Sequence, residues 1–364
     1  MKNIKKIIVY GIIAVLCIAA IAGYAGQKWL KGLGGGSAVV SEAGPGGDKK
    51  KMSDIRDLNN NILPQIVWDR MQKNNVISDK NPVIGAGVGK DFSATTREAV
   101  KNADALEKLI KKGSTVLIKP NMIKSAAPEQ GVETDYRVVQ EIANIARELG
   151  ASRVVVADGS PWGRSFDDTN MYTKLTGVEL IDFNDCREED CYKFTPEKSL
   201  TGGEFYMPKI YMEADVVISA AKLKTHFEAV VTLSLKNIFG VPPVQLTGAG
   251  QGRDYLHNMG ISNSIVDLNK IRKPDFVIID GIIGGEGNMP FSGTPVDSGV
   301  VFAGTDPVAA DTVALNFMGF TLDEIEHVRL AGQEGLGIND LSKIKLVGLD
   351  LNKSQMFFRR SESY

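Results

Sequence analysis

Short apolar runs alternate with amphipathic helical patterns through most of this chain, and this alternation restricts the fold more than any other sequence feature. The runs are rich in β-branched residues, as expected of strands that are buried on both faces. The order therefore predicts an α/β fold with a mostly parallel sheet, helices on both of its faces, and room for two lobes. The expected strands are residues 83–88, 115–118, 153–157, 215–219, 275–279 and 299–303, and the expected helices are residues 94–112, 135–149, 307–318 and 322–334.

The N-terminus carries a different pattern. Lys2, Lys5 and Lys6 precede an apolar run over residues 7–22. Basic residues before an apolar run are typical of an export signal, and with the small residues behind it the run is nearly long enough to cross ~30 Å of hydrocarbon. Trp29 suits the membrane interface and favours an uncleaved anchor over a cleaved signal. We predict a single-pass membrane protein with a cytoplasmic N-terminus and an extracytoplasmic main domain, or a secreted domain if the signal is cleaved.

Composition divides the rest of the chain. A stretch rich in Gly, Ser and Lys follows the apolar run and is typical of a flexible tether. Apolar residues at helical spacing come next, over residues 54–75, with Pro64 placed to bend that helix. We expect an anchor over residues 1–31, a flexible linker over residues 32–53, a helical lead-in over residues 54–80 and the α/β domain over residues 82–350.

The charge of the chain is nearly balanced. Its 42 Lys and Arg residues face 44 Asp and Glu residues, which gives a formal net charge of −2. A nucleic-acid-binding domain normally has a basic face that such a count would reveal. We therefore expect no nucleic-acid partner.

Two cysteines, Cys186 and Cys191, lie outside the apolar run. In an exported domain such a pair either forms a disulfide or stays inert. The chain has no CxxC motif, so an iron–sulfur cluster is not expected.

Polar residues follow several of the expected strands where each strand ends. Any one of them could be a turn or capping residue. However, parallel strands end at one edge of a sheet, where ligands bind in open α/β folds. Four such strand ends therefore predict a common cleft. The residues are Lys119 and Asn121, then Asp158, then Lys222, Lys224 and His226, and finally Asp280.

The segment over residues 214–240 holds the densest set of candidates. Lys222, Lys224 and Lys236 lie among apolar residues, where a cation is costly unless it is paired or reserved for an anion. A ligand carboxylate or phosphate would satisfy these lysines, and so would the protein's own aspartates. His226 can titrate near neutral pH and act as a general acid or base.

The remaining candidates are more ambiguous. His257 lies in a glycine-rich loop and could be a metal ligand, a lid residue or a residue without a role. His327 lies on an expected helix and is predicted to be on the surface. Asp306 precedes Pro307, which is typical of a helix N-cap, and ligand binding is the alternative. Asp158 and Asp280 could orient a ligand or hold a divalent metal.

Several segments together resemble the DUF362 family, whose function is unassigned. The resemblance covers roughly residues 82–348, and the motifs KPN, KLKTH, SLKN and GTDPVAAD make it specific. Many members of that family carry an added ferredoxin domain, whose cysteines this chain lacks. The matching segments are VLIKPNM (116–122), residues 136–160, residues 214–240, DFVIIDGIIGGEG (275–287) and GTDPVAAD (304–311).

A weaker resemblance is to the lactate-racemase-type enzymes, which use a nickel-pincer cofactor. Their core segment has a catalytic histidine ten residues before a lysine that binds the cofactor. His226 and Lys236 keep that interval behind a similar Ala-Asp-Val-Val-Ile strand. The second catalytic histidine expected near Asp158 is absent, and Ser234-Leu235 replaces a glycine pair. The resemblance therefore implies the architecture and not the racemase activity.

The sequence thus predicts a protein that binds a small anionic ligand, with an enzyme using His, Lys and Asp acid–base chemistry as the first hypothesis. The alternatives are a non-catalytic cofactor- or solute-binding component of a membrane redox or assembly system, and a structural role in which the lysines and aspartates pair internally. The sequence does not identify a cofactor, and a divalent metal is one possibility. The expected catalytic residues are His226, Lys236 and Asp158, and the expected ligand-binding residues are Lys119, Asn121, Lys222, Lys224, Asn237, Asp280 and Asp306.

Overall fold

The protein is represented by a computed structural model that describes residues 56–74, 80–123, 126–161, 165–166, 171–247 and 253–363. The expected anchor over residues 1–31 and the linker over residues 32–53 lie outside the described residues. Within the described ranges, no helix combines the length and the apolar character that crossing a membrane requires. Lys49–Tyr364 form one compact unit, so the described part of the domain is not divided into two lobes.

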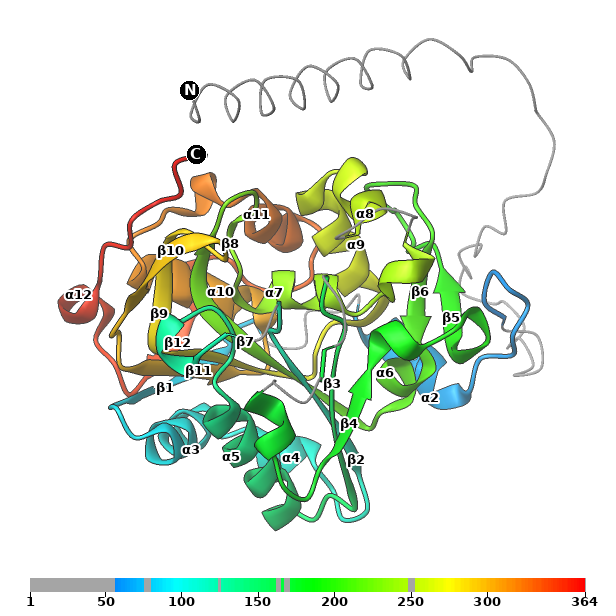
Figure 1. The fold of residues 1–364 in the computed structure, drawn as a ribbon, viewed down its shortest axis with the longest axis horizontal. Helices are drawn as coiled ribbons and strands as arrows, with labels where there is room; N and C mark the ends of the chain where they lie inside the picture. The colour runs from blue at the N-terminus through cyan, green and yellow to red at the C-terminus, as the bar shows by residue number, and fades with distance from the viewer. Residues whose placement is uncertain are drawn as a thin grey trace, which may run out of the picture. The chain divides into compact units, whose positions relative to one another are not determined.

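A single large sheet organises this unit (Figure 1). Its strands lie in the order β12, β1, β11, β9, β7, β2, β3, β4, and along this path only β11 runs antiparallel to its neighbours among the described strands. The expectation of a mostly parallel sheet is therefore confirmed. In path order the strands are Lys345–Val347, Val83–Val88, Val300–Gly304, Phe276–Asn288, Val216–His226, Thr115–Pro120, Arg153–Asp158 and Glu179–Asp182.

Three minor pairings complete the strands. β8 (Val230–Val231) pairs with the end of β7, and β10 (Ser292–Val296) pairs with the end of β9, both antiparallel. β5 (Cys191–Phe194) and β6 (Phe205–Pro208) form a separate two-stranded sheet.

Helices cover both faces of the large sheet, as the alternation predicts (Figure 1). α3 (Phe92–Ala103), α4 (Leu106–Leu109) and α5 (Tyr136–Glu148) lie on one face. The other face carries the remaining helices of the core. These are α7 (Leu233–Asn237), α8 (Asp254–Asn258), α9 (Ile261–Arg272), α10 (Pro307–Phe317) and α11 (Glu326–Gln333), while α2 (Gln65–Asn74), α6 (Lys209–Glu213) and α12 (Leu351–Ser354) lie at the periphery.

The alternation of side chains along each strand produces two apolar cores. On β2, Val116 and Ile118 pack with α5, whereas Leu117 points to the opposite face. All three side chains are fully buried. Burial on both faces explains why these strands read as continuous apolar runs rather than as alternating patterns.

The central strands are longer than the sequence indicates. The expected strand over residues 215–219 extends to His226 in β7, and the expected strand over residues 275–279 extends to Asn288 in β9. Every residue of β7 is buried, including its charged ones. Lys222 and Lys224 thus lie within a strand and not beyond its end. Lys222 can be buried there because Asp280 on β9 pairs with it, and Lys224 because it donates to the carbonyl of Val132.

Three expected helices are shorter. The helix over residues 54–75 is confined to α2 behind Pro64, and an isolated bridge between Arg56 and Ile62 closes the turn before it. The helix over residues 94–112 ends at Ala103, because Asp104 adopts a left-handed backbone with φ of 49°. The helix over residues 322–334 begins as a short 3₁₀ turn, and α11 itself starts at Glu326.

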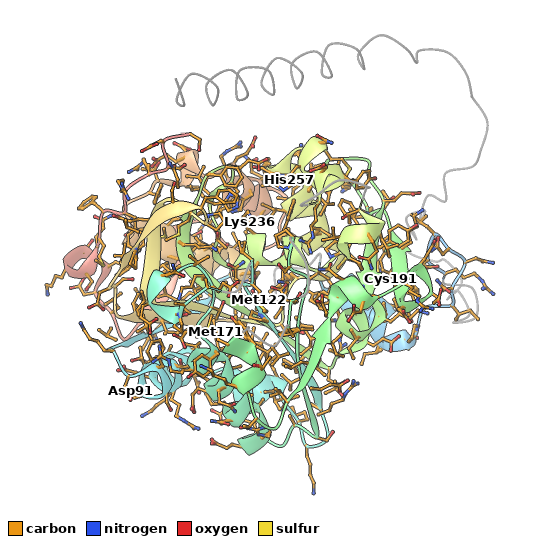
Figure 2. The ribbon with its side chains drawn as sticks, viewed as in Figure 1. Asp91, Met122, Met171, Cys191, Lys236 and His257 are labelled. Atoms are coloured by element: carbon orange, nitrogen blue, oxygen red, sulfur yellow. The ribbon has the colours of Figure 1, made fainter. Side chains whose placement is uncertain are left out.

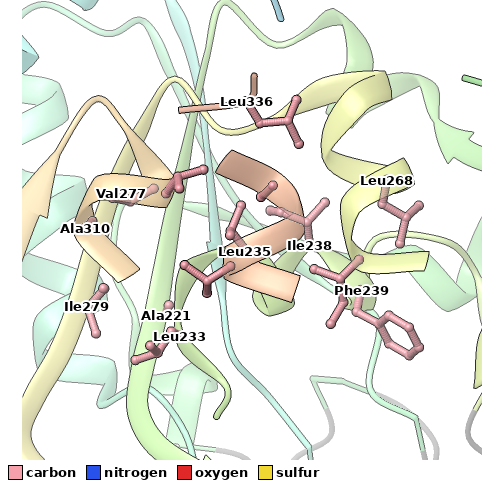
Figure 3. Close-up of a cluster of buried hydrophobic side chains, with 14 of the residues drawn as sticks. Ala221, Leu233, Leu235, Ile238, Phe239, Leu268, Val277, Ile279, Ala310 and Leu336 are labelled. Carbon is pink, nitrogen blue, oxygen red and sulfur yellow. The ribbon is translucent and has the colours of Figure 1, made fainter. Parts of the chain in front are cut away.

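α7 is a single turn held between strands and helices. Leu233, Leu235 and Ile238 pack against β7, β9, α9 and α10 (Figure 3). The carboxylate of Asp311 on α10 accepts hydrogen bonds from the backbone N–H groups of Ser234 (2.8 Å) and Leu235 (2.9 Å). Five residues cannot form a stable helix alone, so these contacts fix the backbone from which the next residue, Lys236, projects.

The close approach of α3 to β1 provides a test of this packing. A Cβ atom on Gly85 would lie 2.2 Å from the carbonyl oxygen of Ala99, an overlap that only a backbone shift could relieve. We expect Gly85→Ala to lower the free energy of unfolding by about 2–3 kcal/mol, measured by chemical denaturation. Val88→Thr, at an exposed position of the same strand, should change it by less than about 0.5 kcal/mol. Equal effects of the two substitutions would contradict this packing.

Candidate functional site

A cavity lies where β2, β3 and β7 end, with a volume of about 630 Å³ that includes its open mouth. The segment around α7, the start of α8 and Pro290 complete its wall. Lys236, His257 and Met122, which all line it, are labelled in Figure 2. Its polar lining residues are Lys119, Asn121, Asp158, His226, Lys236, Asn237, Arg253 and His257.

Lys119 and Asp158 form an ion pair at the base of this cavity, and both side chains are almost completely buried. Asp158 also accepts hydrogen bonds from the backbone N–H groups of Met122 (2.8 Å) and Gly159 (2.9 Å). Burial lowers the pKa of Lys119 and raises the pKa of Asp158, and the attraction between the two groups opposes both shifts. The pair is therefore internally compensated and contributes little net charge to the cavity.

Two asparagines border this ion pair. Asn237 donates through Nδ2 to the Lys119 carbonyl and to the Ser219 hydroxyl, each at 3.0 Å. Its Oδ1 accepts a hydrogen bond of 3.4 Å from Asn121. The Oδ1 atom of Asn121 is buried and has no hydrogen-bond partner among the described residues. The cavity wall thus carries an unused acceptor.

Lys236 is the half-buried cation of the cavity that has no counter-ion. Its ammonium group forms no ion pair or hydrogen bond with any described residue, and it lies 5.4 Å from the centre of the Phe239 ring. Burial lowers its pKa to about 8, and the nearby Arg253 and Lys119 act in the same direction, while Glu228 opposes them. A substantial fraction of Lys236 is therefore a neutral amine near pH 8.

Arg253 is a second cation without a carboxylate partner within the described ranges. It is 2% exposed, and its Nη2 atom donates to the carbonyls of Gly159 (2.5 Å) and Gly240 (3.2 Å). Its Nε atom donates to the Pro242 carbonyl at 3.2 Å, whereas Nη1 has no partner in the described part of the chain. Burial lowers its pKa to about 10, so it stays charged at neutral pH.

Arg253 was not among the candidates predicted from the sequence. It immediately precedes α8, and His257, which the sequence placed in the same glycine-rich loop, lies within that helix. The backbone of Arg253 is left-handed, with φ of 67°, which is uncommon for a residue other than glycine and often marks a functional site. An arginine in a glycine-rich segment could have been singled out in the sequence as a candidate ligand-binding residue. Its burial, however, depends on the tertiary fold.

His226 is held in one tautomer by the turn that follows β7. Its Nδ1 atom accepts hydrogen bonds from the backbone N–H groups of Glu228 (3.1 Å) and Ala229 (3.2 Å). Burial first, and then the charges of Lys236 and Lys224, lower its pKa well below its ordinary value. The ring is therefore neutral at pH 7, with its proton on Nε2, and it can donate but not accept at that atom.

His257 has the opposite arrangement. Its Nδ1 atom lies 2.8 Å from the carboxylate of Glu228, and its ring packs edge-on against Phe239 at 5.1 Å. A carboxylate at Nδ1 favours the tautomer whose proton points to it, which leaves the lone pair on Nε2. His257 is thus the imidazole of this cavity that is arranged to accept a proton.

The prediction that His327 lies on the surface was wrong. His327 on α11 is fully buried, and neither of its ring nitrogens has a hydrogen-bond partner in the described residues. Burial, together with the charge of Lys236, lowers its pKa to about 3. Its burial on a helix that packs against α9 and α10 could not be predicted from helical periodicity alone.

Four of the residues expected to bind a ligand do not line the cavity. Lys222 pairs with Asp280 at 2.7 Å inside the sheet, and Lys224 donates to the carbonyl of Val132 at 2.5 Å. Asp306 caps α10 by accepting hydrogen bonds from the backbone N–H groups of Val308 and Ala309, at 2.9 and 3.0 Å. The sequence left two alternatives open for these residues, ligand binding or contacts within the protein. In the structure they make contacts within the protein.

The described residues offer neither a metal-binding cluster nor a disulfide. The described residues contain no group of three or more His, Cys, Asp or Glu side chains placed to hold a metal ion. Cys186 and Cys191 are both free thiols, so the disulfide considered from the sequence is absent. Burial raises the pKa of Cys186 to about 11 and that of Cys191 to about 12, which keeps both protonated.

The comparisons with known proteins identify one family and one curated relative. The family profile "Domain of unknown function (DUF362)" matches residues 116–316. A thylakoid-associated protein of Synechocystis is 29% identical over 256 residues, which cover 68% of this chain and 75% of that protein.

Two solved structures are similar to part of this chain. Lactate racemase apoprotein from Thermoanaerobacterium thermosaccharolyticum matches with a TM-score of 0.44 and 14% identity, over 67% of this chain and 58% of that one. A structural-genomics target from Thermotoga maritima matches with a TM-score of 0.37 and 11% identity, over 67% of this chain and 60% of that one. The chain thus spans less than two thirds of either solved protein.

The contrast between Lys236 and Lys222 can be tested through stability. The lowering of the Lys236 pKa from 10.5 to about 8 corresponds to roughly 3 kcal/mol that disfavours the folded state at neutral pH. We expect Lys236→Met to raise the free energy of unfolding by up to this amount at pH 7. Between about pH 8 and 10.5 the unfolded chain binds more protons than the folded one, so the stability of the wild type rises and the advantage of the variant disappears.

Lys222→Met is the matched control. It leaves Asp280 buried without its cation and should lower the free energy of unfolding by about 3–5 kcal/mol. Denaturant titrations of both variants at several pH values measure these effects. A destabilised Lys236→Met protein would show that Lys236 has a structural partner.

Proposed function

We propose, from the premise that this chain belongs to the DUF362 family of unknown function, that it is an exported, membrane-tethered protein that binds a small anion in the cavity and acts on it as an enzyme. The observation that carries the proposal is the pair of cations, Arg253 and Lys236, that line one cavity without a carboxylate partner among the described residues. A buried charge without a partner is expensive, and a ligand anion would compensate both charges at once.

The composition of the cavity favours an anion over a neutral ligand. Asp158, the carboxylate of the wall, is already paired with Lys119. The net charge that faces a ligand is therefore positive. A small carboxylate or phosphate could accept hydrogen bonds from the open Nη1 of Arg253 and from Lys236. Water would be displaced from a site that is narrow and partly apolar, which strengthens such contacts.

Proton transfer is the chemistry that the same cavity supports. His226 offers an N–H donor and His257 offers a lone pair oriented by Glu228. A donor and an acceptor that differ in this way are expected where a reaction moves a proton. A protein that only binds its ligand does not require one histidine as a donor and another as an acceptor. We therefore prefer the hypothesis of an enzyme over that of a non-catalytic binding component of a membrane system. The proposal uses only the side chains of this chain and no nickel-pincer cofactor.

Ligand binding can be tested with a panel of small carboxylates and inorganic phosphate, by isothermal calorimetry. We expect at least one member of the panel to bind, and Arg253→Gln to weaken it roughly 100-fold, because a hydrogen-bonded charge contributes about 2–3 kcal/mol. Arg97→Gln, on the exposed surface of α3, should leave the affinity unchanged. Equal affinity in the two variants, or no binding by any member, would rule out the anion site.

The membrane tether is supported by the apolar run over residues 7–22 and by the thylakoid-associated relative. We expect the full chain to stay in the membrane pellet after an alkaline carbonate wash, because the apolar run together with the small residues behind it is nearly long enough to cross ~30 Å of hydrocarbon. A chain that starts at residue 52 should appear in the supernatant. Finding both chains in the same fraction would contradict the tether.

A further inference from the structure

We propose that the ligand is a small 2-oxo acid, whose carboxylate is held by Arg253 while the amine of Lys236 joins its carbonyl carbon as a Schiff base. The proposal rests on the proposed function, because the cavity must first bind an anion. It goes further by assigning a chemical class to the ligand and a covalent role to Lys236.

Lys236 is suited to attack a carbonyl carbon once the anion is bound. It has no ion pair or hydrogen bond with any described residue, and the cations Arg253 and Lys119 lie near it. With its pKa lowered to about 8, about half of the side chain is a neutral amine at pH 8, against roughly one part in 300 for a lysine with a pKa of 10.5. A neutral amine in a cavity is the arrangement that lets lysine react with carbonyl groups.

The acidic partner for a carbonyl oxygen is His226. Because two backbone N–H groups occupy its Nδ1 atom, the neutral ring presents only Nε2–H to the cavity. A fixed N–H donor suits an oxygen that gains negative charge during addition, because it stabilises that charge without reorganisation. The same geometry makes His226 unsuited to remove a proton.

The proton acceptor is His257. Glu228 holds its Nδ1 atom at 2.8 Å, and Nε2 has no hydrogen-bond partner in the described part of the chain. The carboxylate stabilises the imidazolium that forms when Nε2 takes a proton. Since Lys236 and His257 line the same cavity and both contact the Phe239 ring, His257 is placed on the side of the cavity where the lysine lies.

The position of Arg253 specifies the rest of the ligand. Arg253 and Lys236 line the same cavity, and the charge of Arg253 is one of the causes that lower the pKa of Lys236. A ligand that contacts both must carry its anionic group near its carbonyl carbon. A carboxylate bonded directly to the carbonyl satisfies this condition and can accept a hydrogen bond from Nη1 of Arg253, which has no partner among the described residues.

The reaction balances without an additional reactant. The Lys236 ammonium gives one proton to Nε2 of His257, and the free amine attacks the carbonyl carbon, so a C–N bond forms and the C=O electron pair moves to oxygen. His226 Nε2–H holds the alkoxide, which takes a second proton from the nitrogen. His257 then returns the first proton to the hydroxyl group, which leaves as water while the nitrogen lone pair forms the C=N bond. The product is a protonated Schiff base, and His257 is again neutral.

The test is reductive trapping on the wild-type protein. The full-length protein is incubated with pyruvate and cyanoborohydride, digested with trypsin and mapped by mass spectrometry. Trypsin does not cleave after an alkylated lysine, so capture at Lys236 yields one peptide from Thr225 to Arg253 that carries a single reduced pyruvate unit. Oxamate, which has the shape of pyruvate but an unreactive amide carbonyl, should bind and protect this peptide. The peptide with the exposed Lys90 is the internal control.

Two variants and the pH dependence sharpen the result. Lys236→Arg keeps the charge but removes the reactive amine, so the oxamate-sensitive label measured on the intact protein should fall at least tenfold while labelling of the Lys90 peptide is unaffected. Glu228→Gln, which removes the orienting carboxylate, should slow labelling roughly tenfold while oxamate still binds. Labelling of Lys236 should rise with pH and level off near pH 8, whereas labelling of Lys90 should continue to rise. The charged and titratable groups around Lys236 are Glu228, Arg253, Lys119, Lys224, His226, His257 and His327.

The outcomes separate the two proposals. Labelling of Lys236 that oxamate blocks supports the Schiff base. Oxamate binding without selective labelling, or labelling spread over exposed lysines, overturns the Schiff base and leaves the anion site intact. The absence of both binding and labelling overturns the anion site as well. Because the peptide map uses the wild-type protein, a variant that fails to fold does not affect this decision.

Discussion

The structure depends on one constraint, which is that the central strand β7 is buried at every residue although it carries two lysines and a histidine. Each of these groups is almost completely removed from water and must find its partner inside the protein. Lys222 finds Asp280 on the neighbouring strand, Lys224 finds a backbone carbonyl, and His226 finds two backbone N–H groups. These requirements fix the register of β7 against β9 and set the end of the strand at the cavity.

In the cavity, by contrast, some buried polar groups have no partner within the described part of the protein. Lys236 and Arg253 have no acidic partner among the described residues, and the Oδ1 atom of Asn121 is an unused acceptor. Such groups lower stability, and proteins retain them where a ligand will satisfy them. The supporting contacts are correspondingly complete, because Asp311 caps α7 and an apolar cluster surrounds it (Figure 3). Lys236 keeps an unpaired charge only if the backbone of α7 cannot move to bring it a partner.

Much of this architecture was predictable from sequence, because it depends on local patterns. The apolar strand runs, Asp135 at the start of α5 and Asp306 before Pro307 carry signals that neighbouring residues do not change. The ends of β7 and β9 could not be predicted, since lysines and glycines usually indicate a loop and only the pairing between these strands makes them extended. The burial of His327 and Arg253 depends on what packs against them from distant segments. Strand-end topology predicted that Lys119, Asn121, Asp158 and His226 lie around one cavity, and the family resemblance added Lys236 and Asn237. The pairing of Lys222 with Asp280 could be established only from the structure.

The position of β1 between β12 and β11 determines when folding can finish. β1 pairs with β11 and β12 in the described sheet, and both of these strands come more than 200 residues later in the chain. The first strand therefore has no ladder partner until nearly the whole chain is available, and contacts of such long sequence separation form late. A nascent chain with this topology stays unfolded at its leading end while the rest is being made. That delay is well matched to a protein that we propose to cross a membrane as an extended chain, because the fold closes only after its last strand has arrived.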